Sequence, residues 1–184
     1  MTGLEKALEE VARIMDRDGI PYMVIGGAAL LFHGSTRVTK DIDVTVWVDE
    51  SSFAGTLDRL MKSLPGGAGA SIESVAKTRV LTVRATSGVP IDLIFGALPF
   101  EKDAIMRAAK MKLGGVTVRV CRPEDLVIHK VISDRPRDIE DMRFLITRHG
   151  KKMDKKALDR TVEELVKELA RDDILRRYTE CWEE

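Results

Sequence analysis

Cysteine and histidine are scarce in this sequence, which has two cysteines and three histidines among 184 residues. Cys121 and Cys181 lie far apart and form no Cys-x-x-Cys pair. A zinc site of the usual ligand spacing is therefore excluded. Two unpaired thiols are typical of a protein in a reducing compartment, so we expect a cytoplasmic location.

Long apolar runs, low-complexity tracts and internal repeats are also missing. No apolar stretch approaches the roughly 18 residues of a membrane span, and the first residues lack the apolar core of a signal peptide. We therefore expect no membrane partner. What is present, 44% hydrophobic and 33% charged residues, is the composition of a globular protein that buries a core.

The hydrophobic pattern divides the chain at Cys121. Before this residue helical and strand periods alternate, and after it the apolar spacing is helical throughout. These periods predict an α/β core over 1–121 and a helical part over 122–184 that packs on the core. The predicted elements of the core are helices over 4–18, 26–34 and 50–64, strands over 21–25 and 41–48, a hairpin over 78–96, and a second hairpin or a strand pair over 109–121.

Two aspartates interrupt the strand pattern in "RVTKDIDVTV". On a strand, Asp41 and Asp43 project from one face about 7 Å apart, where unpaired carboxylates repel each other. A divalent cation removes this repulsion, and Mg²⁺ prefers oxygen ligands together with substrate phosphates. Asp92, in "PIDLIFG", lies on another predicted strand. Three acids on adjacent strands suit a metal-assisted phosphoryl transfer. Alternatively, the pair faces solvent and Asp92 ends a hairpin turn.

A glycine pair, Gly26 and Gly27, stands where an apolar strand becomes a helix. Glycine lets the backbone approach a phosphate closely, and a helix start offers unpaired N–H groups. Glycine pairs are also common in plain tight turns. The order of strand, glycine pair, helix, Asp-x-Asp and lone Asp favours the first interpretation, because together these parts make a metal–nucleotide site.

These motifs resemble the signature of a known superfamily. "IGGAALLFHGSTRVTKDIDVTV" with "IDLIF" is similar to the DNA polymerase beta-type nucleotidyltransferases. With "RPRDIEDM" added, the chain resembles more narrowly the small prokaryotic nucleotidyltransferases, which include abortive-infection type toxins. The resemblance implies an α/β fold with a nucleotidyltransferase-like mixed sheet flanked by helices. It also implies an enzyme that moves a nucleoside monophosphate from an NTP to an acceptor hydroxyl and releases pyrophosphate.

The resemblance assigns roles to the motif residues. Asp41 and Asp43 would bind Mg²⁺ or Mn²⁺, and Asp92 would complete the metal site and help to activate the acceptor. Gly26 and Gly27 would cradle the NTP, with ATP as one candidate. Many relatives have serine in place of Gly27, so that phosphate contact would depend here on backbone N–H groups.

Lys130 lies within the apolar stripe of a predicted helix in "LVIHKVIS". Lysine is seldom buried without a partner. Its ammonium could extend along the helix to water, or, as the resemblance implies, it could meet the triphosphate. Asp138 and Asp141 share one helix face and could neutralise Lys130 or position the acceptor. They could equally stabilise the start of their own helix.

The sequence does not determine which molecule provides the acceptor hydroxyl. Residues 101–160 contain 16 Lys and Arg against 10 Asp and Glu, and such an excess favours RNA, such as a tRNA end. Arg37 could contact phosphate oxygens, or it could be an ordinary loop charge. A protein hydroxyl or a small aminoglycoside-like molecule are alternative acceptors. A non-catalytic member of a toxin–antitoxin pair, bound to a cognate partner protein, is the alternative of another class.

Overall fold

A mixed sheet organises residues 1–121 in the computed structural model, which describes residues 1–66 and 69–183. The strand order is β3-β4-β2-β1-β6-β5. The strands are β1 (Tyr22–Ile25), β2 (Ile42–Val46), β3 (Val80–Arg84), β4 (Pro90–Phe95), β5 (Ala109–Leu113) and β6 (Val116–Val120). Neighbouring strands are antiparallel in the pairs β3–β4, β1–β2 and β5–β6, and parallel in β2–β4 and β1–β6. The predicted hairpin over 78–96 is therefore confirmed, and residues 109–121 form a second hairpin, one of the two forms expected there.

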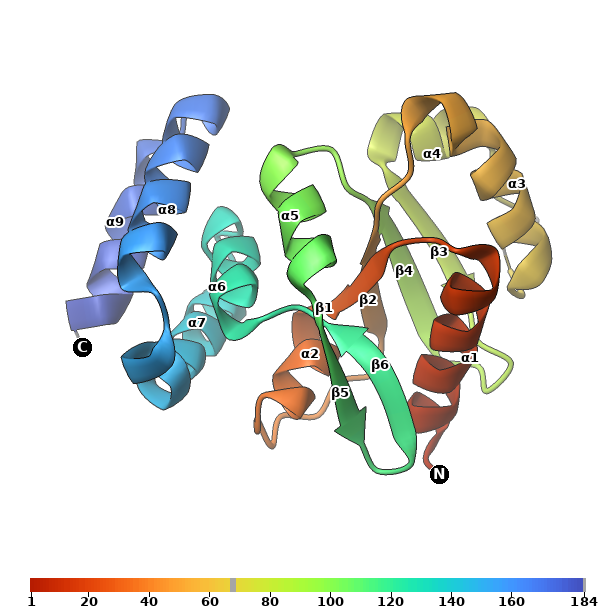
Figure 1. The fold of residues 1–184 in the computed structure, drawn as a ribbon, viewed down its shortest axis with the longest axis horizontal. Coiled ribbons are helices and arrows are strands. Elements are labelled where there is room, and N and C mark those ends of the chain that lie inside the picture. The colour runs from red at the N-terminus through yellow and green to blue at the C-terminus, as the bar shows by residue number, and fades with distance from the viewer. Residues whose placement is uncertain (67–68, 184) are drawn as a thin grey trace. The chain divides into compact units, whose positions relative to one another are not determined.

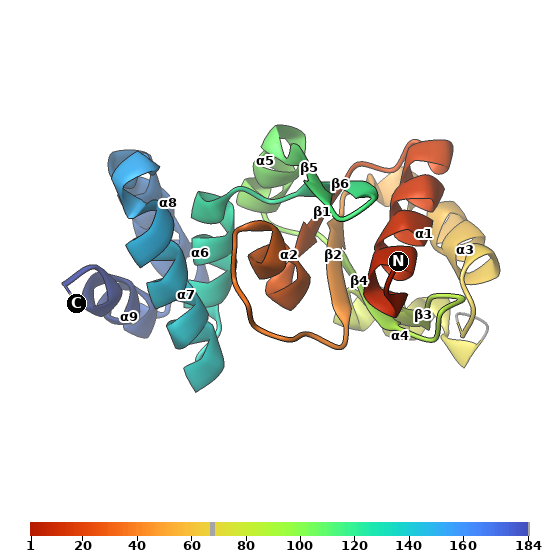
Figure 2. The ribbon, with the colours of Figure 1, turned by 90° about the horizontal axis from the view of Figure 1, so that it is seen from below.

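One face of this sheet is apolar and is buried over its central strands. Alternate residues on β2 and β4, such as Val44 and Leu93, are 0% exposed on this face, as the two-residue period of a strand requires. The helices α1 (Gly3–Asp18) and α3 (Phe53–Ser63) lie on this side (Figure 1 and Figure 2). The rings of Phe53 and Phe95 meet edge to face with centroids 4.9 Å apart.

The opposite face of the sheet carries polar residues. The helices α2 (Gly26–Phe32) and α5 (Pro99–Arg107) lie on this side (Figure 1 and Figure 2). The alternation that buries Val44 and Leu93 turns Asp43 and Asp92 to this face, where both are only partly buried. The sheet therefore has one apolar face that forms the core, and on the opposite face Asp43 and Asp92 remain partly exposed.

Residues 122–184 form a second, helical unit. Its elements are α6 (Pro123–Ile132), α7 (Pro136–His149), the short helix η3 (Gly150–Lys152), α8 (Lys155–Leu169) and α9 (Asp172–Glu183). Arg171 and Arg177 donate to the carbonyl oxygens of Ile132 and Val131, each at 2.9 Å. These bonds satisfy carbonyl groups at the end of α6 that the helix leaves without an internal partner. Within the described residues, no helix is long and apolar enough to cross a membrane.

Some predicted elements differ from the structure. The strand expected from residue 41 begins at Ile42, so Asp41 precedes it. The helix expected over 50–64 begins as a 3₁₀ turn, η1 (Glu50–Ser52), before α3. The helices α4 (Ile72–Thr78) and α5 were not predicted, because α4 buries only Val75 and α5 only Ala104 and Ile105, too few for a clear helical stripe.

Candidate active site

Asp43 and Asp92 occupy directly paired positions on the neighbouring parallel strands β2 and β4. Thr82 of β3 pairs with Asp92 from the other side. Residues in register on adjacent strands project from the same face, with the strands about 4.8 Å apart. The hydroxyl of Thr82 donates to Oδ1 of Asp92 at 2.6 Å, which fixes the orientation of this carboxylate. Thr82, Asp92 and Asp43 thus form a polar row, which we call the aspartate row.

Gly26 lies directly against the carboxylate of Asp43. The β1–β2 register pairs Ile25 with Asp43, so the chain turns past Asp43 immediately after β1. Gly26 has φ +63°, and a Cβ placed on it would lie 1.9 Å from Oδ2 of Asp43. No side chain fits in that space, and the positive φ also favours glycine. The conformation of the turn and the position of the Asp43 carboxylate therefore depend on each other.

Gly27 meets the loop that leads into β2. A Cβ on Gly27 would lie 2.7 Å from Oγ1 of Thr39 and 3.4 Å from Nη2 of Arg37. The Thr39 hydroxyl donates to Oδ1 of Asp41 at 2.8 Å. The loop therefore folds back over the glycine turn and brings Arg37 and Asp41 to it. Asp41 itself is exposed and lies just before the strand.

The carboxylates of the site suit a divalent metal in kind and number. Mg²⁺ in nucleotide enzymes takes one or two protein carboxylates and completes its shell with waters and substrate phosphates. Asp43 and Asp92 can supply such a pair. Among the described residues, no three Asp, Glu, His or Cys side chains form a group that could hold a metal by themselves. Metal binding by Asp41, Asp43 and Asp92 stays a prediction.

A separate charged cluster lies inside the helical unit. The Lys130 ammonium, which is 6% exposed, donates to Oδ1 of Asp138 at 2.5 Å and to Oδ2 of Asp141 at 2.7 Å. Ser133 and Arg135 donate to Oδ2 of Asp138 at 2.7 Å and 2.5 Å. Asp138 and Asp141 thus both form ion pairs with Lys130, which is one of the alternatives that the sequence left open. The alternative that Lys130 extends to water is wrong. Contact of Lys130 with a triphosphate stays a prediction.

The buried cluster shifts two pKa values. Burial by itself would raise the pKa of Asp138, but hydrogen bonds from Lys130, Ser133 and Arg135 outweigh burial and lower it to about 2. Burial, assisted by the charge of Lys130, lowers the pKa of His129 to about 4. At neutral pH Asp138 is therefore ionised and the His129 imidazole is neutral.

The sequence did not identify two threonines that hydrogen-bond aspartates of the site. Thr39 bonds Asp41, and Thr82 bonds Asp92. Thr82 could have been found, because the predicted hairpin places it opposite Asp92 once the register of the turn is known. Nothing in the sequence distinguishes Thr39 from an ordinary loop residue.

The glycine turn, the paired aspartates and the mixed sheet agree with a match to a family model. The model, described as "Nucleotidyltransferase of unknown function (DUF6036)", matches residues 2–181. The chain belongs to this family of nucleotidyltransferases. The predicted enzyme class is thereby confirmed, whereas kinship with the abortive-infection branch stays a prediction. A comparison with curated proteins gives no match.

Two solved structures have a fold similar to that of this nucleotidyltransferase. An antigenic nucleotidyltransferase-like protein from Paracoccidioides brasiliensis has a TM-score of 0.51 and 18% identity, with 96% of this chain and 92% of that one covered. The antibiotic-resistance factor ANT(2'')-Ia has a TM-score of 0.59 and 18% identity, with 91% and 95% covered. They confirm the predicted fold class.

Replacing Gly26 by alanine tests the close approach to Asp43. We expect Gly26→Ala to lower the free energy of unfolding by about 2–5 kcal/mol, because alanine is strained at positive φ and its Cβ collides with the carboxylate. Gly19→Ala is the matched control. Gly19 also has φ +63°, but nothing lies within 4 Å of its Cβ position. Equal losses in urea denaturation would mean that the collision is absent.

Asp138→Asn tests the buried ion pair through pH. The folded-state pKa of Asp138, about 2, lies below its ordinary value of 3.8, so its stabilising effect is complete above pH 4 and disappears as the pH falls toward 2. We expect the variant to lose about 2 kcal/mol at pH 7 and the difference from wild type to shrink below pH 4. The exposed change Glu140→Gln, on the same helix, should have no such effect. A pH-independent difference in denaturation would contradict the pairing.

Proposed function

We propose that this protein transfers a nucleoside monophosphate from an NTP to an acceptor hydroxyl, with Mg²⁺ or Mn²⁺ bound at the aspartate row. The observation that supports this proposal most is the in-register pair Asp43 and Asp92 beside the turn at Gly26. One or two carboxylates on one side of a site are the protein ligands that Mg²⁺ takes together with substrate phosphates.

The reaction needs few protein groups. The acceptor oxygen attacks the α-phosphorus, the bond from that phosphorus to the bridging oxygen breaks, and pyrophosphate leaves. Oδ1 of Asp92 accepts a bond from Thr82, so we assign Oδ2 of Asp92 as the atom that takes the proton of the acceptor. The metal, when bound, neutralises charge on the phosphates. Positioning and charge neutralisation account for most of phosphoryl-transfer catalysis.

The glycine turn and its loop would hold the triphosphate. The Arg37 guanidinium lies beside Gly27, where it can bind phosphate oxygens with two N–H groups. The Thr39 hydroxyl lies 2.7 Å from the Cβ position of Gly27. We infer that this hydroxyl fills the space of the serine that many relatives carry here. Thr39 would then compensate for the glycine.

We propose RNA as the acceptor. Lys151, Lys152 and Lys156 are exposed at the start of α8 and in η3, and clustered lysines attract a phosphate backbone. Lys155 is less available, because its ammonium bonds both oxygens of Asp159 at 2.8 Å and 2.9 Å. The toxin-like role and a cognate antitoxin are supported by the sequence resemblance alone.

The double change Asp43→Asn with Asp92→Asn tests the metal–nucleotide site. In the wild type, Mg²⁺ with an NTP should raise the melting temperature, by a free energy of about 2.7 kcal/mol at a ligand concentration 100 times Kd. The variant should lose this gain and should no longer transfer label from an α-labelled NTP. All four NTPs are tested by differential scanning fluorimetry.

The matched control for this test is Asp49→Asn with Asp103→Asn. It removes the same charge from exposed positions of residues 1–121 and should keep both the gain and the transfer. If the aspartate-row variant keeps the ligand-induced gain, or if both variants lose it, the proposed site is wrong.

A triple change at Lys151, Lys152 and Lys156 to glutamine tests the RNA acceptor. Wild type should bind tRNA at low salt, with affinity falling steeply as salt rises. Each lost phosphate contact should flatten the log–log salt slope by about 0.7. Replacing the exposed Lys77, Lys110 and Lys112 by glutamine changes the net charge equally and should leave the slope unchanged.

A transfer assay with the wild-type protein and an α-labelled NTP identifies the acceptor. With total cellular RNA and lysate present, we expect label from the NTP on RNA. Label on protein or on a small molecule only would replace RNA by that acceptor. RNA binding without salt dependence would also contradict the RNA proposal.

A further inference from the structure

A cavity in the helical unit lies between α8 and α9, outside the groups assigned so far. Its volume is about 410 Å³, which is in the range of about 300–1,000 Å³ for small-molecule sites. The rings of Tyr178 and Trp182 and the side chain of Leu175 give it apolar walls, and carboxylates of Asp159, Glu163 and Glu183 line it as well.

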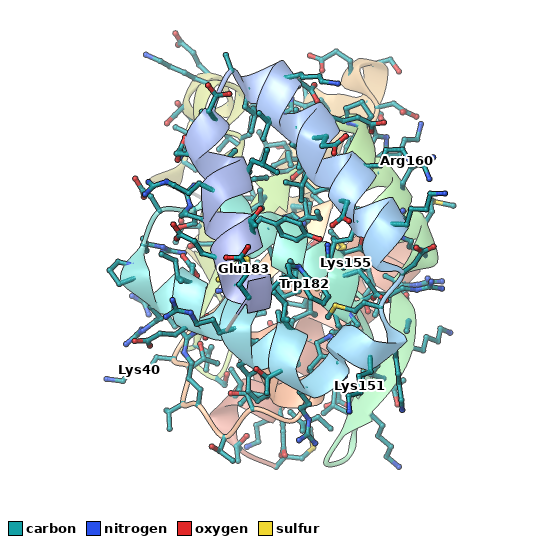
Figure 3. All side chains as sticks on the ribbon, turned by 90° about the vertical axis from the view of Figure 1, so that its left-hand side faces the viewer. Lys40, Lys151, Lys155, Arg160, Trp182 and Glu183 are labelled. Atoms are coloured by element: carbon teal, nitrogen blue, oxygen red, sulfur yellow. The ribbon has the colours of Figure 1, made fainter. Side chains whose placement is uncertain are left out.

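The chain already places an ammonium group in this cavity. The Lys155 ammonium lies 5.1 Å from the ring centroid of Trp182 and 5.6 Å from that of Tyr178, within reach for cation–π attraction. It also bonds both oxygens of Asp159. Figure 3 shows Lys155 of α8 and Trp182 of α9 directed toward each other. The walls of the cavity therefore suit an alkylammonium group, since the side chain of Lys155 is such a group.

The charges that line the cavity do not balance. Asp159 is occupied by Lys155 and by the Tyr178 hydroxyl, which donates at 2.5 Å. Burial, with the neighbouring Asp159, raises the pKa of Tyr178, so the phenol stays neutral and adds no charge. Glu163 and Glu183 are exposed and form no ion pair within the described part of the chain. The carboxylates of Glu163 and Glu183 are therefore available to a ligand.

We propose that this cavity binds a small aliphatic diamine or polyamine. Its two ammonium groups would meet Glu163 and Glu183, and its alkyl body would cover Leu175, an apolar side chain that is 42% exposed. An anion would be repelled by the net charge of the lining. A bare Mg²⁺ ion would find ring faces and alkyl walls in place of the oxygen shell it needs. Diamine binding in this cavity is separate from the proposed transfer reaction and does not depend on it.

The test is calorimetric titration of the full chain with 1,6-diaminohexane, without NTP, at pH 7 and about 150 mM NaCl, where surface charges are largely screened. 1,6-Hexanediol is the neutral control with the same alkyl body. We expect saturable binding of the diamine and none of the diol. Glu163→Gln with Glu183→Gln should weaken diamine binding about tenfold or more, because each lost carboxylate removes a charge-assisted hydrogen bond.

The matched control is Glu164→Gln with Glu168→Gln. This pair removes the same charge from exposed positions of α8 that do not line the cavity, and Kd should change less than about twofold, since screened charges contribute little. Equal weakening by both pairs, equal binding of the diol, or no diamine binding at this salt concentration would each overturn the proposal. All the substituted glutamates are exposed, so the variants should fold.

Discussion

The contact between Gly26 and the Asp43 carboxylate is the constraint on which the candidate site depends. The β1–β2 register brings the glycine turn onto Asp43, and the β2–β4 register brings Asp92 beside it. Any side chain at Gly26 would occupy the position of the carboxylate. Sheet register and turn conformation therefore determine together where the acids, the glycine turn and the Arg37 loop meet.

In the helical unit the constraint is a different one, because this unit buries the charged ammonium of Lys130. A lysine inside an apolar helix stripe is tolerated only with partners, and Lys130 has two in Asp138 and Asp141. Removing one partner of a buried pair typically costs more than the pair contributes. The stability of this unit therefore depends on the buried ion pairs. A loss of activity in a Lys130 variant has to be distinguished from a loss of folding.

Local patterns in the sequence were sufficient for much of the fold. The strand period located β2 and β4 and the hairpins, and the glycine pair located the turn before α2. The sequence gives Thr82 as the partner of Asp92 only once the hairpin register is known, and it could not give the bond from Thr39 to Asp41. It also placed Asp41 on the strand, whereas the local bond to Thr39 holds it in the bend before Ile42.

The most direct test of the account is to locate the metal. Crystals grown with Mn²⁺ and a non-hydrolysable NTP would show the ion by its anomalous scattering. The account predicts Mn²⁺ at ligand distance from the carboxylates of both Asp43 and Asp92, with phosphate oxygens completing its shell. Mn²⁺ bound elsewhere, or a triphosphate bound away from Gly26 and Gly27, would contradict it.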